Sequence, residues 1–207
     1  MSAAPPRAPE GADLEDHAID RASRTDAHAD DRRAGQRDSV AALHAEVDVE
    51  AARLHALHGA RLRCARGCTG CCADDLTVSA PEAAHIRAQH ARLLAEARPH
   101  APGACAFLDG EGACRIYAAR PYVCRTQGLP LRWIDEDAEG EEAVEYRDIC
   151  PLNEAGTPLE ALTPDDCWTL GPAEERLATL GLRGPAGERG AEEPGARVAL
   201  RALFARG

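Results

Sequence analysis

The sequence is densest in cysteine at Cys64-Ala-Arg-Gly-Cys68-Thr-Gly-Cys71-Cys72, where four thiols fall within nine residues. Thiolates are soft ligands that suit zinc and iron–sulfur clusters, and short spacings let one loop wrap an ion with little loss of loop entropy. The stretch therefore predicts a metal site for zinc or iron. Adjacent side chains diverge, so Cys71 and Cys72 need not both reach one ion: one of them could serve a second site or act as a resolving thiol.

Five further cysteines are spread over the rest of the chain: Cys105, Cys114, Cys124, Cys150 and Cys167. Nine cysteines divide into four, four and one, and four thiolates close a tetrahedral zinc site or hold a cubane cluster. The alternative for each later cysteine is a small buried hydrophobe. The turn positions of Cys105, Cys114 and Cys124 favour metal ligation. Cys167, which we expect inside a helix beside Trp168, favours the buried alternative.

The composition predicts a thin hydrophobic core, because aromatic residues make up 3% of the 207 residues and much of the 44% apolar fraction is alanine. Alanine buries little area, and a domain that is short of core usually needs disulfides, a metal or a partner chain. No apolar signal segment follows Met1 and no transmembrane run appears, which predicts a cytoplasmic chain. Thiols stay reduced in the cytoplasm, so the clustered cysteines favour a metal over a disulfide framework.

The charge balance limits the classes of partner. The formal net charge is −11, and every fixed positive side chain is arginine, because the chain has no lysine. An acidic chain disfavours binding to nucleic acid or to anionic membranes, both of which require a basic patch. The acidic stretch at 135–142 is expected to be a solvated loop, with a cation or partner site as the alternative. A metal ion is the predicted partner, and no protein partner is indicated.

Composition divides the chain into three regions. Residues 1–38 hold almost no large apolar side chains and predict a disordered tail, whereas 39–182 are expected to form the cysteine-cluster domain. Residues 183–207 combine a linker rich in glycine and proline with a short helix at 196–206.

Hydrophobic spacing predicts helices at 39–59, 80–98 and 163–181, the second of which begins with a capping box of Ser79 and Glu82. His55 and His58 lie three apart on the first helix and could approach a metal together, or simply form an exposed polar face. Short strands are expected at 76–78, in a hairpin at 104–117, and where 129–134 pairs with 143–149. The predicted fold class is α+β: a small metal-stapled domain of a few helices and short β-hairpins, with irregular loops around the cysteines.

Three segments together resemble a known group, the YkgJ-type cysteine-cluster family, described as a zinc- or iron-chelating domain. They are the CxxxCxxCC run that begins at Cys64, the stretch Cys105-Ala-Phe-Leu-Asp-Gly-Glu-Gly-Ala-Cys114-Arg-Ile-Tyr117, and the stretch Arg120-Pro121-Tyr-Val-Cys124-Arg125. The order and spacing of these segments resemble the family over roughly residues 55–155.

The resemblance implies zinc or iron as the metal and implies a ligand set of Cys64, Cys68, Cys71, Cys72, Cys105, Cys114 and Cys124, to which we add Cys150. Flagellin lysine methylase is similar over the same cluster, which implies an alternative function, an iron–sulfur redox or protein-modifying enzyme. Arg120 and Arg125 lie in the most family-like stretch. They could donate hydrogen bonds to thiolate sulfur, or pair structurally with Asp148 or a backbone carbonyl.

Overall fold

The computed structural model describes residues 39–65, 67–136, 143–183 and 195–204. The predicted tail at 1–38, most of the acidic stretch at 135–142 and most of the predicted linker after residue 183 lie outside these ranges. The described chain folds into helices and short strands in two small sheets, so the predicted α+β class is confirmed. None of the helices in the described ranges is long and apolar enough to cross a membrane.

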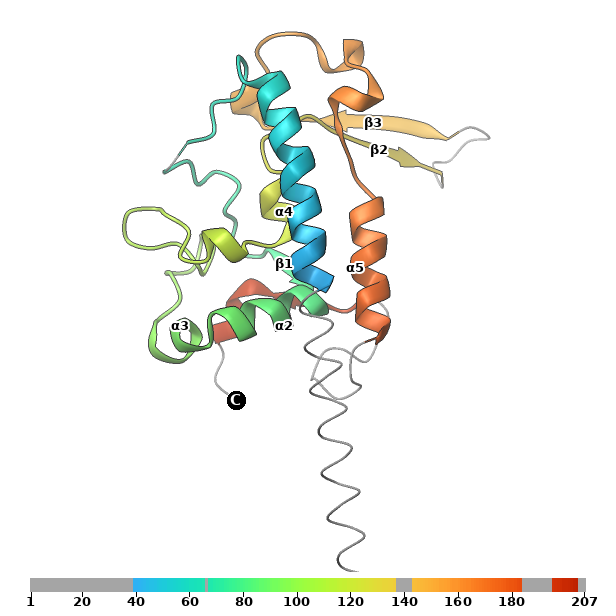
Figure 1. Cartoon of the computed structure of the whole chain (residues 1–207). Helices are drawn as coiled ribbons and strands as arrows, with labels where there is room; N and C mark the ends of the chain where they lie inside the picture. Colours follow the sequence, from blue (N-terminus) through green and yellow to red (C-terminus); the bar gives the residue numbers. More distant parts are fainter. Residues whose placement is uncertain (1–38, 66, 137–142, 184–194, 205–207) are drawn as a thin grey trace, which may run out of the picture.

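A helix over residues 39–58 confirms the first predicted helix and builds one half of the hydrophobic interior. Its apolar residues Leu43, Val47, Ala51 and Leu54 recur every three to four positions and so share one buried face. This face packs against α5 (Pro172–Arg183), which lies alongside the helix in Figure 1. We call this cluster the helix core. It also contains Tyr122, Leu129, Trp168, Ala173 and Leu177.

The second half of the interior lies beneath the cysteine loop. Strand β1 (Thr77–Ser79) pairs antiparallel with β5 (Arg197–Ala199), and α2 (Ala80–Gln89) follows β1 directly. The predicted capping box is confirmed, because Ser79 accepts from the Glu82 backbone N–H while the Glu82 carboxylate accepts from Ser79. We call this cluster the cysteine core. Its buried members are Val78, Ala83, Ile86, Cys105, Ala106, Phe107, Leu108, Ile116, Leu200, Leu203 and Phe204.

Two helix predictions in this half were wrong in extent. The helix expected at 80–98 breaks at His90, whose backbone leaves the helical region (φ −126°, ψ 29°), and α3 (Ala91–Glu96) starts afresh. The helix expected at 196–206 begins instead as strand β5, because β1 offers an unpaired edge there. It ends as the 3₁₀ turn η5 (Leu200–Phe204), which places Leu200, Leu203 and Phe204 in the cysteine core.

A three-stranded sheet, in the order β3-β2-β4, closes the other end of the helix core. The predicted pairing of 129–134 with 143–149 is confirmed as β2 (Leu131–Asp135) against β3 (Val144–Asp148), with Trp133 opposite Tyr146. Strand β4 (Trp168–Thr169) runs parallel to β2.

The helix predicted at 163–181 was wrong over residues 163–171, because α5 begins only at Pro172. Thr163 and Asp166 form a capping box around the 3₁₀ turn η4 (Pro164–Asp166), and Trp168 N–H then donates to the Pro130 carbonyl over 2.8 Å. Gly171, with a φ of 113° that favours glycine, separates this strand from α5. Cys167 and Trp168 therefore stand on an extended segment, because pairing with β2 outcompetes local helix propensity.

The predicted hairpin at 104–117 is reduced to one antiparallel bridge between Leu108 and Cys114. The Asp109 carboxylate accepts from the backbone N–H groups of Glu111 and Ala113 and so closes the turn by itself. After it come the 3₁₀ turn η1 (Tyr117–Ala119) and the short helix α4 (Tyr122–Arg125). Two further 3₁₀ turns, η2 (Pro151–Asn153) and η3 (Leu159–Ala161), follow β3.

Candidate metal centre

Two consecutive turns shape the cysteine loop. The N–H of Cys68 donates to the Ala65 carbonyl and that of Cys72 donates to the Thr69 carbonyl, each over 2.9 Å. Gly67, at φ 89°, lets the chain reverse between Cys64 and Cys68. One turn therefore lies between Cys64 and Cys68 and a second precedes Cys72, and these two turns keep all four cysteines within one loop.

One group of thiols converges at the edge of the cysteine core. The Cys105 N–H donates to the Cys72 carbonyl over 2.8 Å, and Cys72 and Cys114 both pack against the buried cluster that contains Cys105. Burial, together with the nearby thiols of Cys105, Cys114, Cys72 and Cys71, raises the pKa of Cys124 to about 12. Cys72, Cys105 and Cys114 thus gather at the cysteine core, and Cys124 lies close enough for their charge to act on its thiol. We call Cys72, Cys105, Cys114 and Cys124 the inner group.

The electrostatics of the inner group favour a cation. Burial, followed by the thiols of Cys71, Cys105 and Cys114, raises the pKa of Cys72 to about 12. Burial also raises the pKa of Cys114, although the nearby guanidinium groups of Arg120 and Arg115 oppose that rise. Thiols gathered out of water stay protonated because their negative charges would repel one another, and a bound metal cation reverses that balance.

The other cysteines of the loop face away from the core. Cys64 and Cys71 are exposed and Cys68 is half-buried. Burial raises the pKa of Cys71, a hydrogen bond with the Cys72 side chain lowers it, and the nearby thiols of Cys68 and Cys64 raise it, so Cys71 lies beside Cys72 as well as near Cys68 and Cys64. We call Cys64, Cys68 and Cys71, with Cys150, the outer group.

The link from Cys150 to this loop is Asn153, a residue that the sequence reasoning missed. Asn153 is fully buried, and its amide Nδ2 donates to Cys64 Sγ over 3.4 Å and to the Gly128 carbonyl over 2.7 Å. Its Oδ1 accepts from the Arg63 N–H, and its own N–H donates to the Cys150 carbonyl over 2.7 Å. Cys150 is thereby held one 3₁₀ turn away from the residue that touches Cys64.

Gly128 lies directly beneath the Cys64 side chain, and we call this close contact the cradle of Cys64. The sequence reasoning also missed Gly128. A Cβ on Gly128 would lie 2.6 Å from Cys64 Sγ, closer than real Cβ atoms approach other heavy atoms, and 3.1 Å from Asn153 Nδ2, which is a tight contact. The backbone of Gly128 also has a φ of 90°, which favours glycine. The only sequence signal for these two residues was their nearness to Cys124 and Cys150.

The ninth cysteine, Cys167, lies elsewhere. It is buried beside β4 and lines a cleft of about 310 Å³ between the 39–58 helix and α5, together with Glu46, Arg53 and Arg176 among others. None of the other eight cysteines lines this cleft. Cys167 is therefore a small buried side chain, as the alternative to metal ligation predicted. It lies on an extended segment and not on the helix that we expected.

All nine cysteines are free thiols, so the donor set is intact. As they stand, no three Cys, His, Asp or Glu side chains within the described ranges are arranged to hold a metal ion. The chemistry of the donors and the cradle at Gly128 both fit a thiolate-bound metal.

The two histidines that the sequence left open as metal neighbours, His55 and His58, have different surroundings. His58 is buried and its Nε2 contacts the Asp166 carbonyl over 2.7 Å, whereas His55 is exposed. His44 is also buried, where its Nε2 lies 3.1 Å from Glu82 Oε1. The tail residues His17 and His28 lie outside the described ranges.

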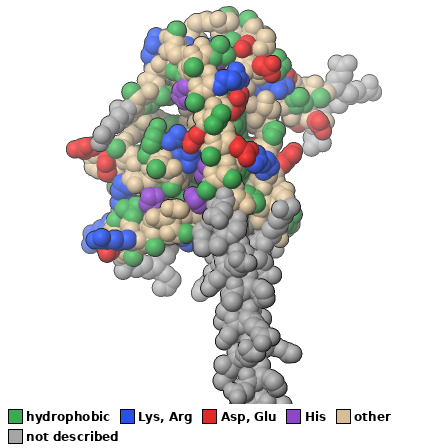
Figure 2. Space-filling view, viewed as in Figure 1, with side chains coloured by type: hydrophobic (Ala, Val, Ile, Leu, Met, Phe, Trp, Pro, Cys, Tyr) green, Lys and Arg blue, Asp and Glu red, His purple; other side chains and the backbone are tan. Residues whose placement is uncertain are grey.

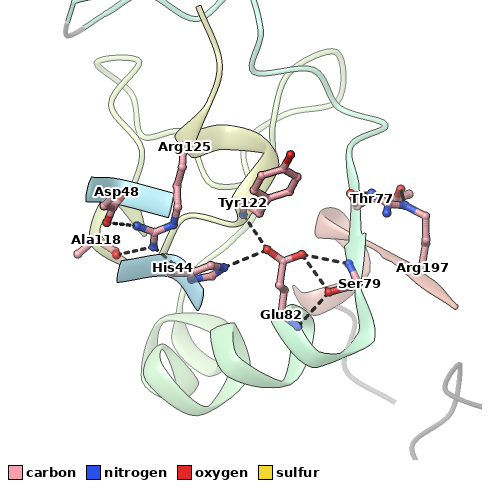
Figure 3. Close-up of polar contacts among 9 residues, drawn as sticks. All are labelled: His44, Asp48, Thr77, Ser79, Glu82, Ala118, Tyr122, Arg125 and Arg197. Atoms are coloured by element: carbon pink, nitrogen blue, oxygen red, sulfur yellow. Dashed lines mark hydrogen bonds and ion pairs between the residues drawn. The ribbon is translucent and has the colours of Figure 1, made fainter. Parts of the chain in front are cut away.

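The two arginines of the family-like stretch bind oxygen and nitrogen acceptors, not sulfur. Arg125 pairs with Asp48 and donates to the Ala118 carbonyl and to His44 Nδ1 (Figure 3). The prediction that such an arginine binds a backbone carbonyl is confirmed for Arg125. The predicted partner Asp148 was wrong, because the 39–58 helix places Asp48 beside the Arg125 guanidinium. Arg120 stacks on the Tyr117 ring at 4.2 Å and donates to the Tyr117 carbonyl.

A buried network around Glu82 fixes the position of α4 and therefore of Cys124. The Glu82 carboxylate accepts from the Tyr122 N–H over 2.7 Å and contacts His44 Nε2, which ties α2, α4 and the 39–58 helix together (Figure 3). A guanidinium can only donate, so His44 Nδ1 accepts from Arg125 and His44 Nε2 donates to Glu82. Cys124 lies between the anchored residues Tyr122 and Arg125.

On the face shown in Figure 2, arginine and acidic side chains are interspersed. Two exposed ion pairs, Arg53 with Glu50 and Arg176 with Glu46, illustrate this on the 39–58 helix and α5. Such exposed pairs contribute little stability individually.

Comparison with protein families agrees with the chemistry of the cysteines. Residues 63–151 match the CxxCxxCC family, a "putative zinc- or iron-chelating domain". The match begins one residue before Cys64 and ends one residue after Cys150, so the CxxCxxCC domain contains both the inner and the outer group. The expected resemblance to a zinc- or iron-chelating cysteine-cluster family is confirmed, and with it metal binding as the general activity. Neither curated proteins nor solved structures gave a match to the chain.

Proposed function

We propose that this protein holds zinc or iron, the latter as an ion or an iron–sulfur cluster, through eight thiolates. The proposed ligands are Cys64, Cys68, Cys71, Cys72, Cys105, Cys114, Cys124 and Cys150. The gathering of Cys72, Cys105 and Cys114 at the cysteine core supports the proposal, as does the match of residues 63–151 to a zinc- or iron-chelating domain. Free thiols of this kind are kept in the reducing cytoplasm, which is the compartment that we propose.

Metal binding to the inner group would stabilise the fold. The interior consists of two modest clusters, and the inner group stands where the cysteine core meets the loop and α4. A metal bound there would crosslink residues 72, 105, 114 and 124, and the free energy of binding would stabilise the fold directly. Arg115 and Arg120 lie near Cys114 and offset part of the negative charge of four bound thiolates.

The enzyme alternative has less support from the structure. An iron–sulfur redox or protein-modifying enzyme related to flagellin lysine methylase needs a substrate cavity that opens onto the metal. The cleft between the 39–58 helix and α5 is lined by Cys167, and none of the proposed ligands faces it. Metal binding for structure, storage or delivery is therefore the better-supported function.

The deciding experiment measures metal in protein purified without oxygen, using elemental analysis by mass spectrometry and visible absorption. We expect zinc in a colourless protein, or iron with sulfide in a brown one. Cys124→Ser should lose bound metal and melt at a lower temperature, whereas Cys167→Ser serves as the matched control and should keep the wild-type metal content. Metal-free wild-type protein that is equally stable after chelation would overturn the proposal.

A further inference from the structure

We propose that two copies of this chain form a symmetric dimer by pairing their β3 strands, edge to edge, into one continuous sheet. Strand β3 is the outermost strand in the order β3-β2-β4, so one of its sides has no neighbouring strand within the described ranges. The β2–β3 hairpin also extends away from the helices, as Figure 1 shows. The partner is a second copy of the chain, and the pairing uses none of the proposed metal ligands.

The backbone groups of Glu145 and Arg147 point outward from this edge. On the other side of β2, the carbonyl of Arg132 accepts from the Leu170 N–H, so the backbone of Arg132 faces β4. Backbone direction alternates along a strand, so the neighbours of Arg132 in β2 face β3 and pair there with residues 144, 146 and 148. Glu145 and Arg147 lie between these pairs and therefore face away from β2. No hydrogen bond within the described ranges reaches their backbone N–H or carbonyl groups.

Strand β3 lacks two of the features that keep edge strands from pairing with other chains. It contains no proline, and its register with β2 runs over all five residues without a bulge. Val144 and Tyr146 are exposed, although exposed edge positions are usually polar. The Tyr146 ring stacks on Trp133, with 5.5 Å between the two ring centroids. The edge therefore offers a regular backbone and an aromatic surface to another strand.

The order of charges along β3 selects one register for two antiparallel copies. The twofold axis of such a pair passes beside one residue, which then lies opposite its own copy. If that residue is Tyr146, Glu145 lies opposite Arg147 of the second copy, and Arg147 lies opposite the second Glu145. Centring the pair on Glu145 or on Arg147 would place like charges directly opposite each other, which is unfavourable. The middle of β3 is thus complementary to itself when Tyr146 faces Tyr146.

This register also satisfies the outward backbone groups. Glu145 and Arg147 of opposite copies become hydrogen-bonded pairs, and each pair exchanges both of its N–H···O=C bonds. The two Tyr146 residues then form a pair without backbone hydrogen bonds, in which side chains lie closest. Because residues directly opposite each other share one face of a sheet, the stack of Trp133 on Tyr146 continues across the axis.

The charged side chains are already held on the other face of the hairpin. Glu145 lies 2.9 Å from the Arg132 guanidinium and 2.6 Å from that of Arg147 in its own chain. Arg147 also donates to the carbonyls of Leu159 and Leu162 in η3. Dimerisation adds a second arginine beside each Glu145, and these side chains need little further ordering to meet it.

The test is sedimentation of the reduced full-length protein over a wide range of concentration, because strand pairing alone buries a small area and gives a weak dimer. The reducing buffer excludes dimers that are linked by disulfides. We expect the average mass to rise from monomer toward dimer as the concentration increases. Wild-type protein that stays monomeric at every concentration would overturn the proposal, even if the same edge bound a strand of another protein.

Two variants of Glu145 test the backbone contact and the register. Glu145→Pro removes an outward N–H but no bond to β2, so it should abolish the dimer while the melting temperature stays close to that of the wild type. Glu145→Arg places arginine opposite Arg147 and should weaken the dimer about tenfold. Glu96→Arg makes the same change of charge on the exposed face of α3 and is the matched control, which should dimerise as the wild type does.

A mixture of two variants tests whether these charges meet across the axis. Glu145→Arg carries arginine at both positions and Arg147→Glu carries glutamate at both, so each should pair poorly with itself and well with the other. If Arg147→Glu does not fold, because η3 loses its donor, the wild type and the two Glu145 variants still decide the matter. Dimer affinity that Glu145→Pro and Glu145→Arg leave unchanged would place the interface elsewhere and overturn the proposal.

Discussion

The amide of Asn153 donates a hydrogen bond to Cys64 Sγ over 3.4 Å, although 89 positions separate the two residues along the chain. The same side chain accepts from the Arg63 N–H and donates to the Gly128 carbonyl, so one buried asparagine joins the segment around Cys64 to the segment around Gly128. Four predictions test this arrangement and the packing that supports it.

Asn153→Ala should destabilise the metal-free protein and weaken metal binding in the outer group. The change leaves the Arg63 N–H and the Gly128 carbonyl without side-chain partners in the interior, which costs on the order of 2–3 kcal/mol. Urea denaturation measures the first effect and zinc competition the second. Asn153→Asp is the matched control: it keeps the acceptor for Arg63 but replaces the donor at Cys64 with a repelling oxygen. Equal zinc affinity in Asp and wild-type proteins would contradict a role at the sulfur.

Gly128→Ala should disturb Cys64 beyond the cost of the backbone. An alanine at a φ of 90° costs about 1–2 kcal/mol wherever it occurs, and here its Cβ also meets Cys64 Sγ at 2.6 Å. Gly103→Ala is the matched control, because Gly103 has a φ of 99° and nothing lies within 4 Å of its added Cβ. We expect Gly128→Ala to lower outer-group zinc binding and Gly103→Ala to leave it unchanged. Metal analysis at limiting zinc decides between them, and identical losses in both proteins would rule out the cradle.

Glu82→Gln should remove part of the dependence of stability on pH. Burial raises the pKa of Glu82, but hydrogen bonds from His44 and the Tyr122 N–H outweigh it, so the pKa of Glu82 lies below the ordinary value of a glutamate. A carboxyl whose pKa is lower in the folded state stabilises the fold above the unfolded pKa and loses that contribution as the pH falls through the folded value.

The measurement for Glu82 is the difference in unfolding free energy between wild-type and Glu82→Gln proteins from pH 7 to pH 3. The difference should be largest at neutral pH and should shrink below about pH 4.5. Comparing the two proteins cancels the other carboxylates, whose pKa values are lowered by arginine or backbone donors, such as Glu145 and Asp166. A constant difference across this range would show that Glu82 does not titrate with folding.

Trp168→Phe and Tyr122→Phe should each destabilise the protein by about 1 kcal/mol, because the Trp168 indole N–H donates to the Tyr122 hydroxyl over 2.8 Å in the helix core. The double variant should cost less than the sum of the two, since only one hydrogen bond is lost. Urea denaturation of the four proteins gives the coupling energy. Strict additivity would mean that the two side chains do not interact in solution.

Local signals in the sequence were sufficient for several elements. The 39–58 helix follows from apolar residues at helical spacing, and α2 begins where Ser79 and Glu82 form their capping box. The pairing of β2 with β3 follows from two apolar runs joined by a polar loop. Each of these features depends on residues close together in the chain, so pattern and propensity decide them.

Sequence patterns did not predict the features that depend on contacts between residues far apart in the chain. Cys167 and Trp168 look helical locally, but backbone pairing with β2 and Pro130 makes them extended. Residues 197–199 form a strand because the backbone of β1 pairs with them. The helix break at His90 also could not be predicted, because no proline or glycine lies next to it.

The sequence by itself determined that this protein gathers cysteines for a thiophilic metal, because thiol chemistry and short spacing do not depend on the fold. Only the tertiary structure brought Cys72, Cys105 and Cys114 to one buried cluster and set Asn153 and Gly128 around Cys64. The physical reason is that sulfur atoms from distant segments meet only after two hydrophobic clusters have packed, and no local pattern encodes that packing.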